Sequence, residues 1–328
     1  MSDWTQQEAL ATAALRRLGC DPAAAALTSR VLAGGLSGSS VHHLDLTGHA
    51  MVLKVTPPSE DRQLMMRAGR EVLFYQDLAT HVPVLVPRVL GLDFNETEGA
   101  VLLLAAYLPS PSPDAWTVHN YVEVARQLGR LHAASWDKTA ASSLPNWLHA
   151  KPAVTLAQCR EAAKVWHVLS ERDDLRDALA PHRRSLEHLV MSIPTLDPQM
   201  TTMPATLCHG DCHAGNLLLD RAGEWIWADW QEVRLGPGVD DLAFFWQRSF
   251  VAADMTPPYD AMVQAYVVGL ETGGEVQIIR EQLDRALAWA ELRSWLVDWP
   301  SYLGALSSAQ MERVLQRIEK LIRHLADR

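Results

Sequence analysis

A run of alternating prolines, Pro109-Ser110-Pro111-Ser112-Pro113, constrains the fold of this chain more than any other feature of its sequence. Because proline fixes φ and has no amide hydrogen, neither a strand nor a helix interior can continue through such a run. Before the run, short apolar segments separated by Gly-rich turns predict strands, whereas after it helical spacing predominates. We therefore expect a linker here, which joins a β-rich N-terminal lobe of residues 1–108 to a mainly helical C-terminal lobe of residues 109–328.

The apolar periodicity predicts the elements of both lobes. In the N-terminal lobe it predicts a small antiparallel sheet, with strands at residues 29–33, 41–46, 50–55, 89–94 and 101–104 and helices at residues 5–18 and 60–80. In the C-terminal lobe it predicts helices at residues 116–136, 156–170, 175–192, 240–250, 259–270, 276–299 and 309–326. Residues 205–230 interrupt this pattern with short apolar runs and polar loops, which indicates short strands that carry functional loops.

The composition is that of an ordinary globular protein, with 48% hydrophobic and 21% charged residues, and this excludes a disordered chain. A formal net charge of −10 argues against a nucleic-acid-binding protein, which presents a basic face. Half of that net charge falls in residues 201–255, where eight acidic residues face three basic ones. Such a concentration of carboxylates is costly unless a cation neutralises it, and a divalent metal would do so.

Three features of the sequence bear on where the protein works. Four scattered cysteines do not form a disulfide framework, and the start MSDWTQQEAL lacks the basic and apolar regions of a signal peptide. The longest apolar run, at residues 100–108, is about half the length needed to cross a bilayer. We therefore expect a cytoplasmic protein that does not bind membranes.

The most informative stretch is His209-Gly210-Asp211-Cys212-His213-Ala214-Gly215-Asn216, which is followed by Asp229 after an apolar hairpin pattern. It supplies a carboxylate, an amide five residues later and then a second carboxylate. Phosphoryl transfer needs this set, because one carboxylate accepts the proton of an attacking hydroxyl while an amide oxygen and another carboxylate hold magnesium.

This stretch resembles the aminoglycoside phosphotransferase and choline kinase-like superfamily, including its ecdysteroid-kinase-like members. Two further motifs stand in the same order: Leu128-Gly129-Arg130-Leu131-His132-Ala133 before it, and Asp240-Asp241-Leu242-Ala243 after Asp229. The resemblance implies an α+β, two-lobed protein-kinase-like fold. It also implies an enzyme that uses ATP and Mg²⁺ to phosphorylate a hydroxyl of a small molecule.

Matching positions imply roles for individual residues. Asp211 corresponds to the catalytic base, Asn216 and Asp229 to the magnesium ligands, and Asp241 to a buried acid that holds the backbone of the catalytic loop. Lys54 corresponds to the strand lysine that holds nucleotide phosphates, with Glu71 as its helix partner. The other implied nucleotide contacts come from the loop over the phosphates and the hinge beside adenine: Gly35, Ser37, Gly38, Ser39, Ala105, Ala106 and Tyr107.

The residues around Lys54 support this role independently. It is the only lysine in the first 137 residues, and it lies within an apolar strand pattern. A buried lysine without a partner is costly, and pairing with Glu71 and a phosphate removes that cost. The same predicted helix also offers Asp77 as a partner.

Other interpretations of these residues remain open. Cys208, His209, Cys212 and His213 form a zinc-like pattern, although four ligands within six residues rarely converge on one metal, so we expect packing and loop bracing instead. The tryptophans at 289, 295 and 299 have the spacing of a helix core stripe, although some of them would line an acceptor pocket in this family.

Two other functions compete with a small-molecule kinase. A protein kinase needs a long activation segment ending in Ala-Pro-Glu, but Asp241 follows Asp229 by only twelve positions. A catalytically silent binding protein of the same fold would keep the motifs without turnover. For an enzyme, the nearly balanced charge and many tryptophans of the C-terminal lobe predict a neutral or singly cationic acceptor, unless Asp284, Glu291 and Asp298 converge on one pocket.

Overall fold

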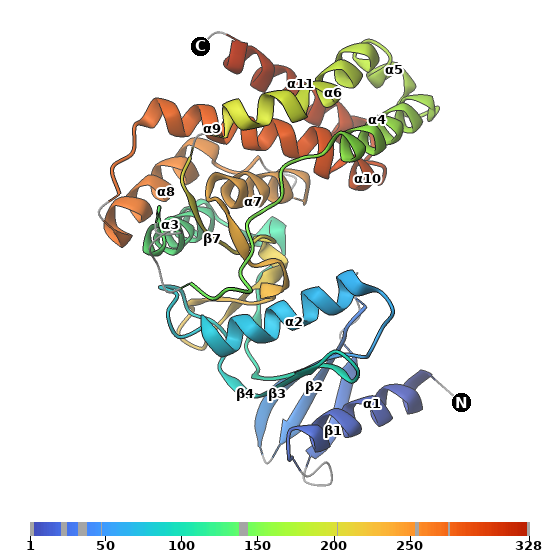
Figure 1. The fold of residues 1–328 in the computed structure, drawn as a ribbon, viewed down its shortest axis with the longest axis vertical. Coiled ribbons are helices and arrows are strands. Elements are labelled where there is room, and N and C mark those ends of the chain that lie inside the picture. The colour runs from blue at the N-terminus through green and yellow to red at the C-terminus, as the bar shows by residue number, and fades with distance from the viewer. Residues whose placement is uncertain are drawn as a thin grey trace. The chain divides into compact units, whose positions relative to one another are not determined.

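The computed structural model describes residues 3–20, 25–31, 38–46, 48–137, 144–201, 203–252, 256–274 and 276–326 (Figure 1). The chain forms two compact units. The first contains residues 1–111, 145–147 and 209–233, and the second contains residues 112–144, 148–208 and 234–328. The segment 209–233, which the sequence places in the C-terminal lobe, thus belongs to the unit that contains the N-terminal sheet. The fold is α+β, with a sheet-forming N-terminal region and a helical C-terminal region.

The first unit is built on a five-stranded antiparallel sheet with the strand order β1-β2-β3-β5-β4. Its strands are β1 (Ala25–Val31), β2 (Ser40–Leu46), β3 (His49–Thr56), β4 (Val89–Asn95) and β5 (Gly99–Ala105). In Figure 1 this sheet lies between helices α1 (Asp3–Arg17) and α2 (Arg62–Asp77). All five strands overlap the predicted ones, and β1 begins four residues earlier than expected.

The side chains of β3 alternate between the two faces of the sheet, and this alternation determines the direction of Lys54. Leu53 and Val55 belong to the buried cluster that packs against Ala11, Ala14 and Leu15 of α1. Because successive side chains in a strand point to opposite faces, Lys54 between them points to the other face, where α2 packs. The sheet therefore directs its lysine toward the helix that carries Glu71.

Helix α2 sits close against the sheet for reasons visible in its sequence. Asp61 accepts hydrogen bonds from the backbone amides of Gln63 and Leu64, so the helix begins after this cap and not at residue 60. Gly69 faces the ring of Phe94, and a Cβ at Gly69 would lie only 2.6 Å from the ring. The close approach of α2 to β4 thus requires glycine at this position.

A small three-stranded sheet completes the first unit, with the order β6-β8-β9. Strands β8 (Leu217–Leu219) and β9 (Trp225–Trp227) form the predicted hairpin, and β6 (Leu108–Pro109) pairs along its edge. The proline run therefore begins as an edge strand, a position that tolerates proline.

The second unit is mainly helical. It contains α3 (Val118–Ala134), α4 (Leu156–Glu171), α5 (Arg176–Leu179), α6 (Arg183–Met200), α7 (Val239–Ala252), α8 (Tyr259–Gly273), α9 (Arg280–Arg293), α10 (Pro300–Leu303) and α11 (Ser308–Ala326). A two-stranded sheet of β7 (Ala205–Cys208) and β10 (Arg234–Pro237) lies in the same unit. Among the described residues, no helix combines the length and the apolarity that crossing a bilayer requires.

Two predicted helices are wrong in their extent. The helix expected at 175–192 is split into α5 and α6 next to Pro181, which has no amide to donate, and α6 continues to Met200. The helix expected at 276–299 starts at Arg280 and changes into a π-helical turn at Ser294–Asp298, in which the amide of Trp299 donates to the carbonyl of Ser294. A single π-helical turn adds one residue to the helix locally, and one such turn is too short to change the apolar period of the sequence.

Charged side chains are buried in the second unit as a paired network. The Arg293 guanidinium donates to Asp197 Oδ1 at 3.0 Å and to Asp240 Oδ1 at 2.7 Å, and Lys151 Nζ lies 2.9 Å from Asp240 Oδ2. Burial would raise the pKa of Asp240, but Lys151 and Arg293 lower it below the ordinary value. Trp289 donates to Asp197 as well, at 2.8 Å, so this tryptophan belongs to the core. Trp295 and Trp299 are also buried.

We expect Arg293→Met to lower the free energy of unfolding by about 3–5 kcal/mol, because it leaves two buried carboxylates without their shared cation. Since the folded-state pKa of Asp240 is lowered, the network stabilises the fold above about pH 4 and loses this contribution as the pH falls through the folded-state value. Urea unfolding at pH 7 measures the loss. Arg280→Met, on the same helix but half exposed beside Asp284, is the matched control and should cost less than about 1 kcal/mol. Equal losses in the two variants would contradict the assignment.

Candidate active site

Lys54 lies between two carboxylates of the first unit. Its Nζ is 2.7 Å from Glu71 Oε2 and 2.8 Å from Asp229 Oδ1. The Glu71 side chain is almost fully buried, whereas that of Asp229 is 31% exposed. The partner in α2 is therefore Glu71 and not Asp77, whose carboxylate instead accepts a hydrogen bond from Trp147 Nε1. Lys54, Glu71 and Asp229 are called the lysine triad below.

The electrostatics of the triad favour a charged lysine. Burial alone would lower the pKa of Lys54, but the attraction of Glu71 and Asp229 raises it above the ordinary lysine value. Burial raises the pKa of Glu71, opposed by the charge of Lys54 and by the backbone amide of Trp230. The ammonium group of Lys54 is therefore a fixed positive charge within the triad. Of its two carboxylate partners, that of Asp229 is the more exposed.

The backbone at Asp229 is held in an unusual conformation. Asp229 follows β9 and has φ 62° and ψ 64°, in the left-handed region that non-glycine residues rarely occupy. The next residue, Trp230, stacks on Phe74 of α2 with ring centroids 4.0 Å apart and an interplanar angle of 8°. Strained backbone persists where the surroundings over-determine it, and such residues cluster at functional sites.

A second contact joins the same turn to α2. Glu232 lies 2.5 Å from Arg67 and 3.4 Å from Arg70, one residue before Glu71. The stack on Phe74 and these ion pairs therefore fix Asp229 against the helix that also carries Glu71. Neither contact was predicted from the sequence, because partners more than 150 positions apart leave no local pattern.

Hydrogen bonds hold the catalytic loop in one shape. The backbone amide of Asp211 donates to Nδ1 of His209 at 3.3 Å, so the proton of this imidazole is on Nε2, which donates to the carbonyl of Ala228 at 3.0 Å. Gly210 has a φ of 85°, which allows the sharp turn between these residues. His209 therefore braces the loop, as the sequence predicts.

The carboxylate of Asp211 is held by its neighbours. Asn216 Nδ2 donates to Asp211 Oδ2 at 3.1 Å and to its backbone carbonyl at 2.9 Å. Burial would raise the pKa of Asp211, but the nearby imidazole of His213, with smaller contributions from His209 and the Asn216 amide, lowers it below the ordinary value. Asp211 is thus a carboxylate at neutral pH, as a proton acceptor must be.

The oxygens of Asn216 and Asp229 fit a magnesium ion. The amide of Ala228 donates to the carbonyl of Asn216 at 2.9 Å, so Asn216 lies beside the residue that precedes Asp229. Within the described part of the chain, Asn216 Oδ1 and Asp229 Oδ2 have no hydrogen-bond partner. Carboxylate and amide oxygens are the ligands that Mg²⁺ takes in proteins.

The remaining predicted nucleotide contacts fall at the ends of strands. Gly35 and Ser37 lie outside the described residues. Gly38 has a φ of 68°, and Ser39 Oγ is 2.7 Å from Thr56 Oγ1. The amides of Ala105 and Ala106 donate to the carbonyls of Arg88 and Ala50, and the Tyr107 hydroxyl accepts from the amide of Arg88. Both alanine amides therefore donate within the first unit, and the role of residues 105–107 as a nucleotide hinge stays a prediction.

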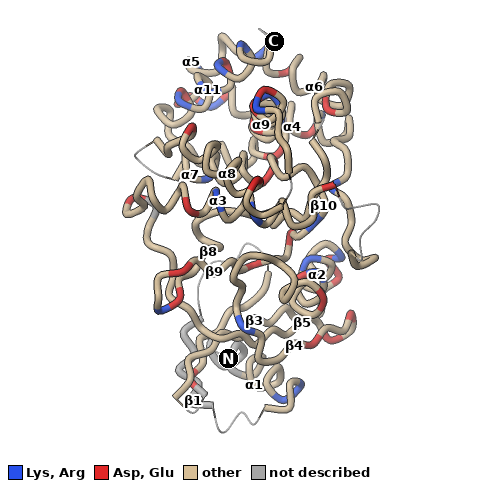
Figure 2. Tube along the Cα trace, turned by 90° about the vertical axis from the view of Figure 1, so that its left-hand side faces the viewer, with Lys and Arg blue, Asp and Glu red and all other residues tan. Residues whose placement is uncertain are grey.

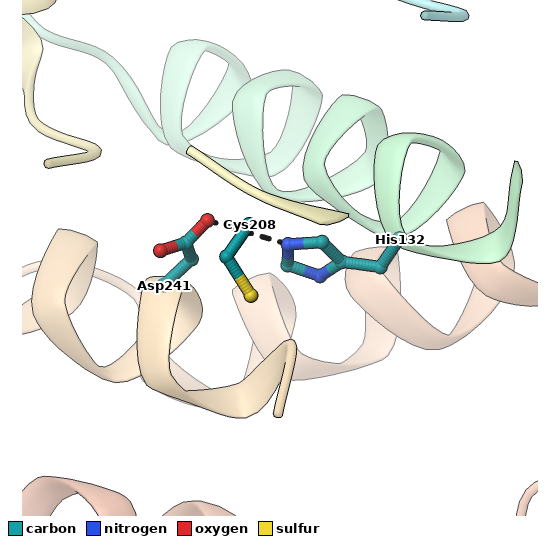
Figure 3. A group of neighbouring side chains, drawn as sticks. All are labelled: His132, Cys208 and Asp241. Atoms are coloured by element: carbon teal, nitrogen blue, oxygen red, sulfur yellow. Dashed lines mark hydrogen bonds and ion pairs between the residues drawn. The ribbon is translucent and has the colours of Figure 1, made fainter. Parts of the chain in front are cut away.

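The zinc-like pattern does not form a metal site. Of the described residues, only His132, Cys208 and Asp241 bring three candidate ligand atoms within 4.8 Å of one another, deep in the second unit (Figure 3). Burial raises the pKa of the Cys208 thiol well above its usual value. His132 instead contacts Asp241 Oδ2 at 3.4 Å and the Tyr266 hydroxyl at 2.9 Å. The expected contact of Asp241 with the catalytic loop stays a prediction.

A cavity of about 1100 Å³ lies in the second unit. Its walls come from α4, α6 and residues 297–301, with Trp166, Leu186 and Met191 among its apolar residues. None of the predicted catalytic, nucleotide-binding or metal-binding residues lines it, whereas Asp298, one of the three acids weighed for an acceptor pocket, does. Lys54, Glu71, Asp211, Asn216 and Asp229 all belong to the first unit.

Comparison with known proteins agrees with this geometry. A model of the phosphotransferase enzyme family matches residues 28–277, which is more than half of the chain. The chain therefore belongs to the phosphotransferase enzyme family. The sequence has no significant match among curated proteins.

Three solved structures share this fold. Choline kinase from Cryptosporidium parvum is 14% identical, with 95% of this chain and 94% of that chain covered and a TM-score of 0.60. Macrolide 2′-phosphotransferase from Brachybacterium faecium is 20% identical, with 97% of each chain covered and a TM-score of 0.53. Spectinomycin phosphotransferase in complex with ADP and spectinomycin is 13% identical, with 90% of this chain and 92% of that chain covered and a TM-score of 0.51.

We expect Lys54→Met to lower the free energy of unfolding by about 3–5 kcal/mol, because buried Glu71 loses its cation and faces Asp229 without compensation. Adding Glu71→Gln to this variant removes the unpaired negative charge of Glu71, and the glutamine oxygen still accepts the hydrogen bond from the amide of Trp230. The double variant should therefore be more stable than Lys54→Met alone, as chemical unfolding of the four proteins in the cycle measures. If Glu71→Gln instead lowers the free energy of unfolding of the Lys54→Met variant further, Lys54 does not compensate the charge of Glu71.

Proposed function

We propose that this protein transfers the γ-phosphate of ATP to a hydroxyl of a small molecule. The observation that carries the proposal is the lysine triad, a fixed cation held between Glu71 and Asp229 in the same unit as the carboxylate of Asp211. Phosphoryl transfer depends on positioning and on charge stabilisation, and this arrangement supplies both. A cytoplasmic setting, where ATP is available, belongs to the same proposal.

Each of the site residues has its own proposed role in the reaction. Lys54 faces the phosphates and compensates charge that develops on their oxygens. Asn216 and Asp229 would hold Mg²⁺, which when bound neutralises the phosphate oxygens. Asp211 accepts the hydroxyl proton while the acceptor oxygen bonds to the γ-phosphorus and the bond to the leaving ADP oxygen breaks. The ADP in the spectinomycin phosphotransferase structure supports nucleotide binding in this fold.

Two observations weigh against the competing functions. Between Asp229 and Asp241 the chain forms only a 3₁₀ turn (Trp230–Glu232) and strand β10 before α7 begins, which leaves no long segment to seat a peptide. Figure 2 shows acidic and basic positions interspersed along the backbone of the second unit, and the formal net charge of −10 also favours an acceptor other than nucleic acid. Release of ADP on addition of an acceptor separates a kinase from a silent binding protein.

We expect Asp211→Asn to lower kcat by about 10²–10⁴-fold, because the amide keeps the shape but cannot accept the hydroxyl proton. The affinity for Mg·ATP should change little. ADP release with the best acceptor from a screen of alcohols, sugars, amino alcohols and antibiotics measures kcat. Glu224→Gln, an exposed acid of the same acid-rich segment, is the control and should be unchanged. Normal turnover of Asp211→Asn would remove Asp211 from the mechanism.

The acceptor is proposed to be neutral or singly cationic, with an apolar portion. A polycationic acceptor needs several free carboxylates, because desolvated cations must be paired. Two of the three candidate acids in the second unit are already engaged: Glu291 is fully buried against Arg317 at 2.6 Å, and Asp284 lies 2.8 Å from Arg280. The choline kinase and macrolide phosphotransferase names are compatible with such an acceptor, whereas spectinomycin, named with the third structure, carries two amino groups.

We therefore expect macrolides, choline-like amines or neutral alcohols to be phosphorylated faster than kanamycin. A side-by-side turnover assay at equal concentrations of each acceptor, with Mg·ATP and Mg·GTP in separate arms, gives the order of kcat/KM. Kanamycin turned over far faster than the others would contradict the acceptor class and leave the kinase proposal intact.

A further inference from the structure

We infer that His213 is a positioning residue, which orients the Asp211 carboxylate so that Oδ1 is the atom that takes the acceptor proton. The inference rests on the proposed function and adds to it the orientation of the base. His209, the other histidine of the motif, contacts the backbone on both sides, whereas His213 faces the carboxylate itself.

The imidazole of His213 is fixed by its own loop. Its Nδ1 accepts a hydrogen bond from the amide of Gly215 at 3.0 Å, so the proton of the neutral ring is on Nε2. The carbonyl of His213 accepts the amide of Asn216 at 2.9 Å. The ring packs on Gly215, where a Cβ would lie 2.9 Å from Cε1. The direction of the Nε2 proton is thus set by the backbone of the loop.

That proton is aimed at one oxygen of the base. His213 Nε2 lies 3.7 Å from Asp211 Oδ2, and Asn216 Nδ2 donates to the same oxygen at 3.1 Å. The distance of 3.7 Å exceeds that of a formed hydrogen bond, and catalytic hydrogen bonds commonly shorten when substrate binds. Among the described residues Asp211 Oδ1 has no hydrogen-bond partner. Two donors therefore face Oδ2, which leaves Oδ1 for the proton.

The orientation of the Asp211 carboxylate determines which of its oxygens accepts the acceptor's proton during phosphoryl transfer. As the acceptor O–H bond breaks, its proton moves to Oδ1 while the acceptor oxygen bonds to the γ-phosphorus and ADP leaves. A carboxylate free to rotate would present an oxygen already facing donors, or would misalign its lone pair. Misplacement of a reacting group by about 1 Å costs about 10²-fold in rate.

Two substitutions separate this role from simple capping of the loop. The amide oxygen of His213→Asn reaches the position of Nδ1, so this variant keeps the acceptor for the Gly215 amide and loses the donor toward Asp211. The amide nitrogen of His213→Gln reaches the position of Nε2, so this variant keeps the donor and loses the acceptor. His49→Asn, an exposed histidine of β3, is the control for an added asparagine.

The experiment compares these four proteins, all checked for an unchanged thermal melt, in two measurements. The first is the crystal structure of each with Mg²⁺ and a non-hydrolysable ATP analogue. The second is kcat and KM by ADP release with the best acceptor of the screen. We expect one carboxylate orientation in wild type and His213→Gln and two in His213→Asn, whose kcat falls about 10–100-fold with little change in KM.

Two results would overturn the inference: a single, unchanged Asp211 orientation in His213→Asn, or equal kcat losses in both variants. A third result is also informative. If the Asp211 carboxylate has one orientation that depends on residue 213, but the protein transfers no phosphate, the proposed function alone is contradicted. If His213→Gln fails to fold, the carboxylate orientation in His213→Asn still decides, because that variant lacks the donor toward Asp211. If His213→Asn fails to fold, a second orientation in His213→Gln, which keeps the donor, would overturn the inference.

Discussion

The ion pairs of Lys54 are the interaction on which the site depends. A lysine in the middle of an apolar strand has to be paired, and the alternation of β3 points it toward α2 and not toward the α1 cluster. Glu71 meets it there at 2.7 Å, and Asp229 completes the pairing at 2.8 Å. Helix α2, which carries Glu71, packs closely at Gly69 against Phe94, and Asp229 is held at a positive φ after β9.

The catalytic loop and the sheet form one structural unit. The hairpin β8–β9 places Asn216 beside Ala228, so the loop that holds Asp211 and the turn that holds Asp229 are connected by backbone hydrogen bonds. Glu232 and Trp230 then anchor that turn to α2 through Arg67, Arg70 and Phe74. The lysine proposed to face the phosphates and the proposed proton acceptor therefore belong to the same unit.

The sequence predicts the fold class, the strands and the charged site residues, because each leaves a local pattern: alternation in β3, a solitary lysine, and an acid–amide–acid spacing. Glu71 could not be separated from Asp77 in this way, because the choice depends on Trp147, which binds Asp77 from a distant part of the chain. The π-helical turn after α9 and the break at Pro181 were also missed. Gly35 and Ser37 lie outside the described residues, and the nucleotide roles of Gly38, Ser39 and Ala105–Tyr107 stay predictions.

The central claim is that the first unit binds Mg·ATP through the lysine triad. Thermal unfolding of the wild-type protein with ATP, in the presence of Mg²⁺ and then of a chelator, tests it most directly. Because a ligand that binds only the folded state stabilises it by about 2.7 kcal/mol at a hundredfold excess over Kd, the unfolding temperature should rise with Mg·ATP and fall back when the metal is chelated. An unfolding temperature that does not respond to millimolar Mg·ATP, or responds equally without magnesium, would contradict the account.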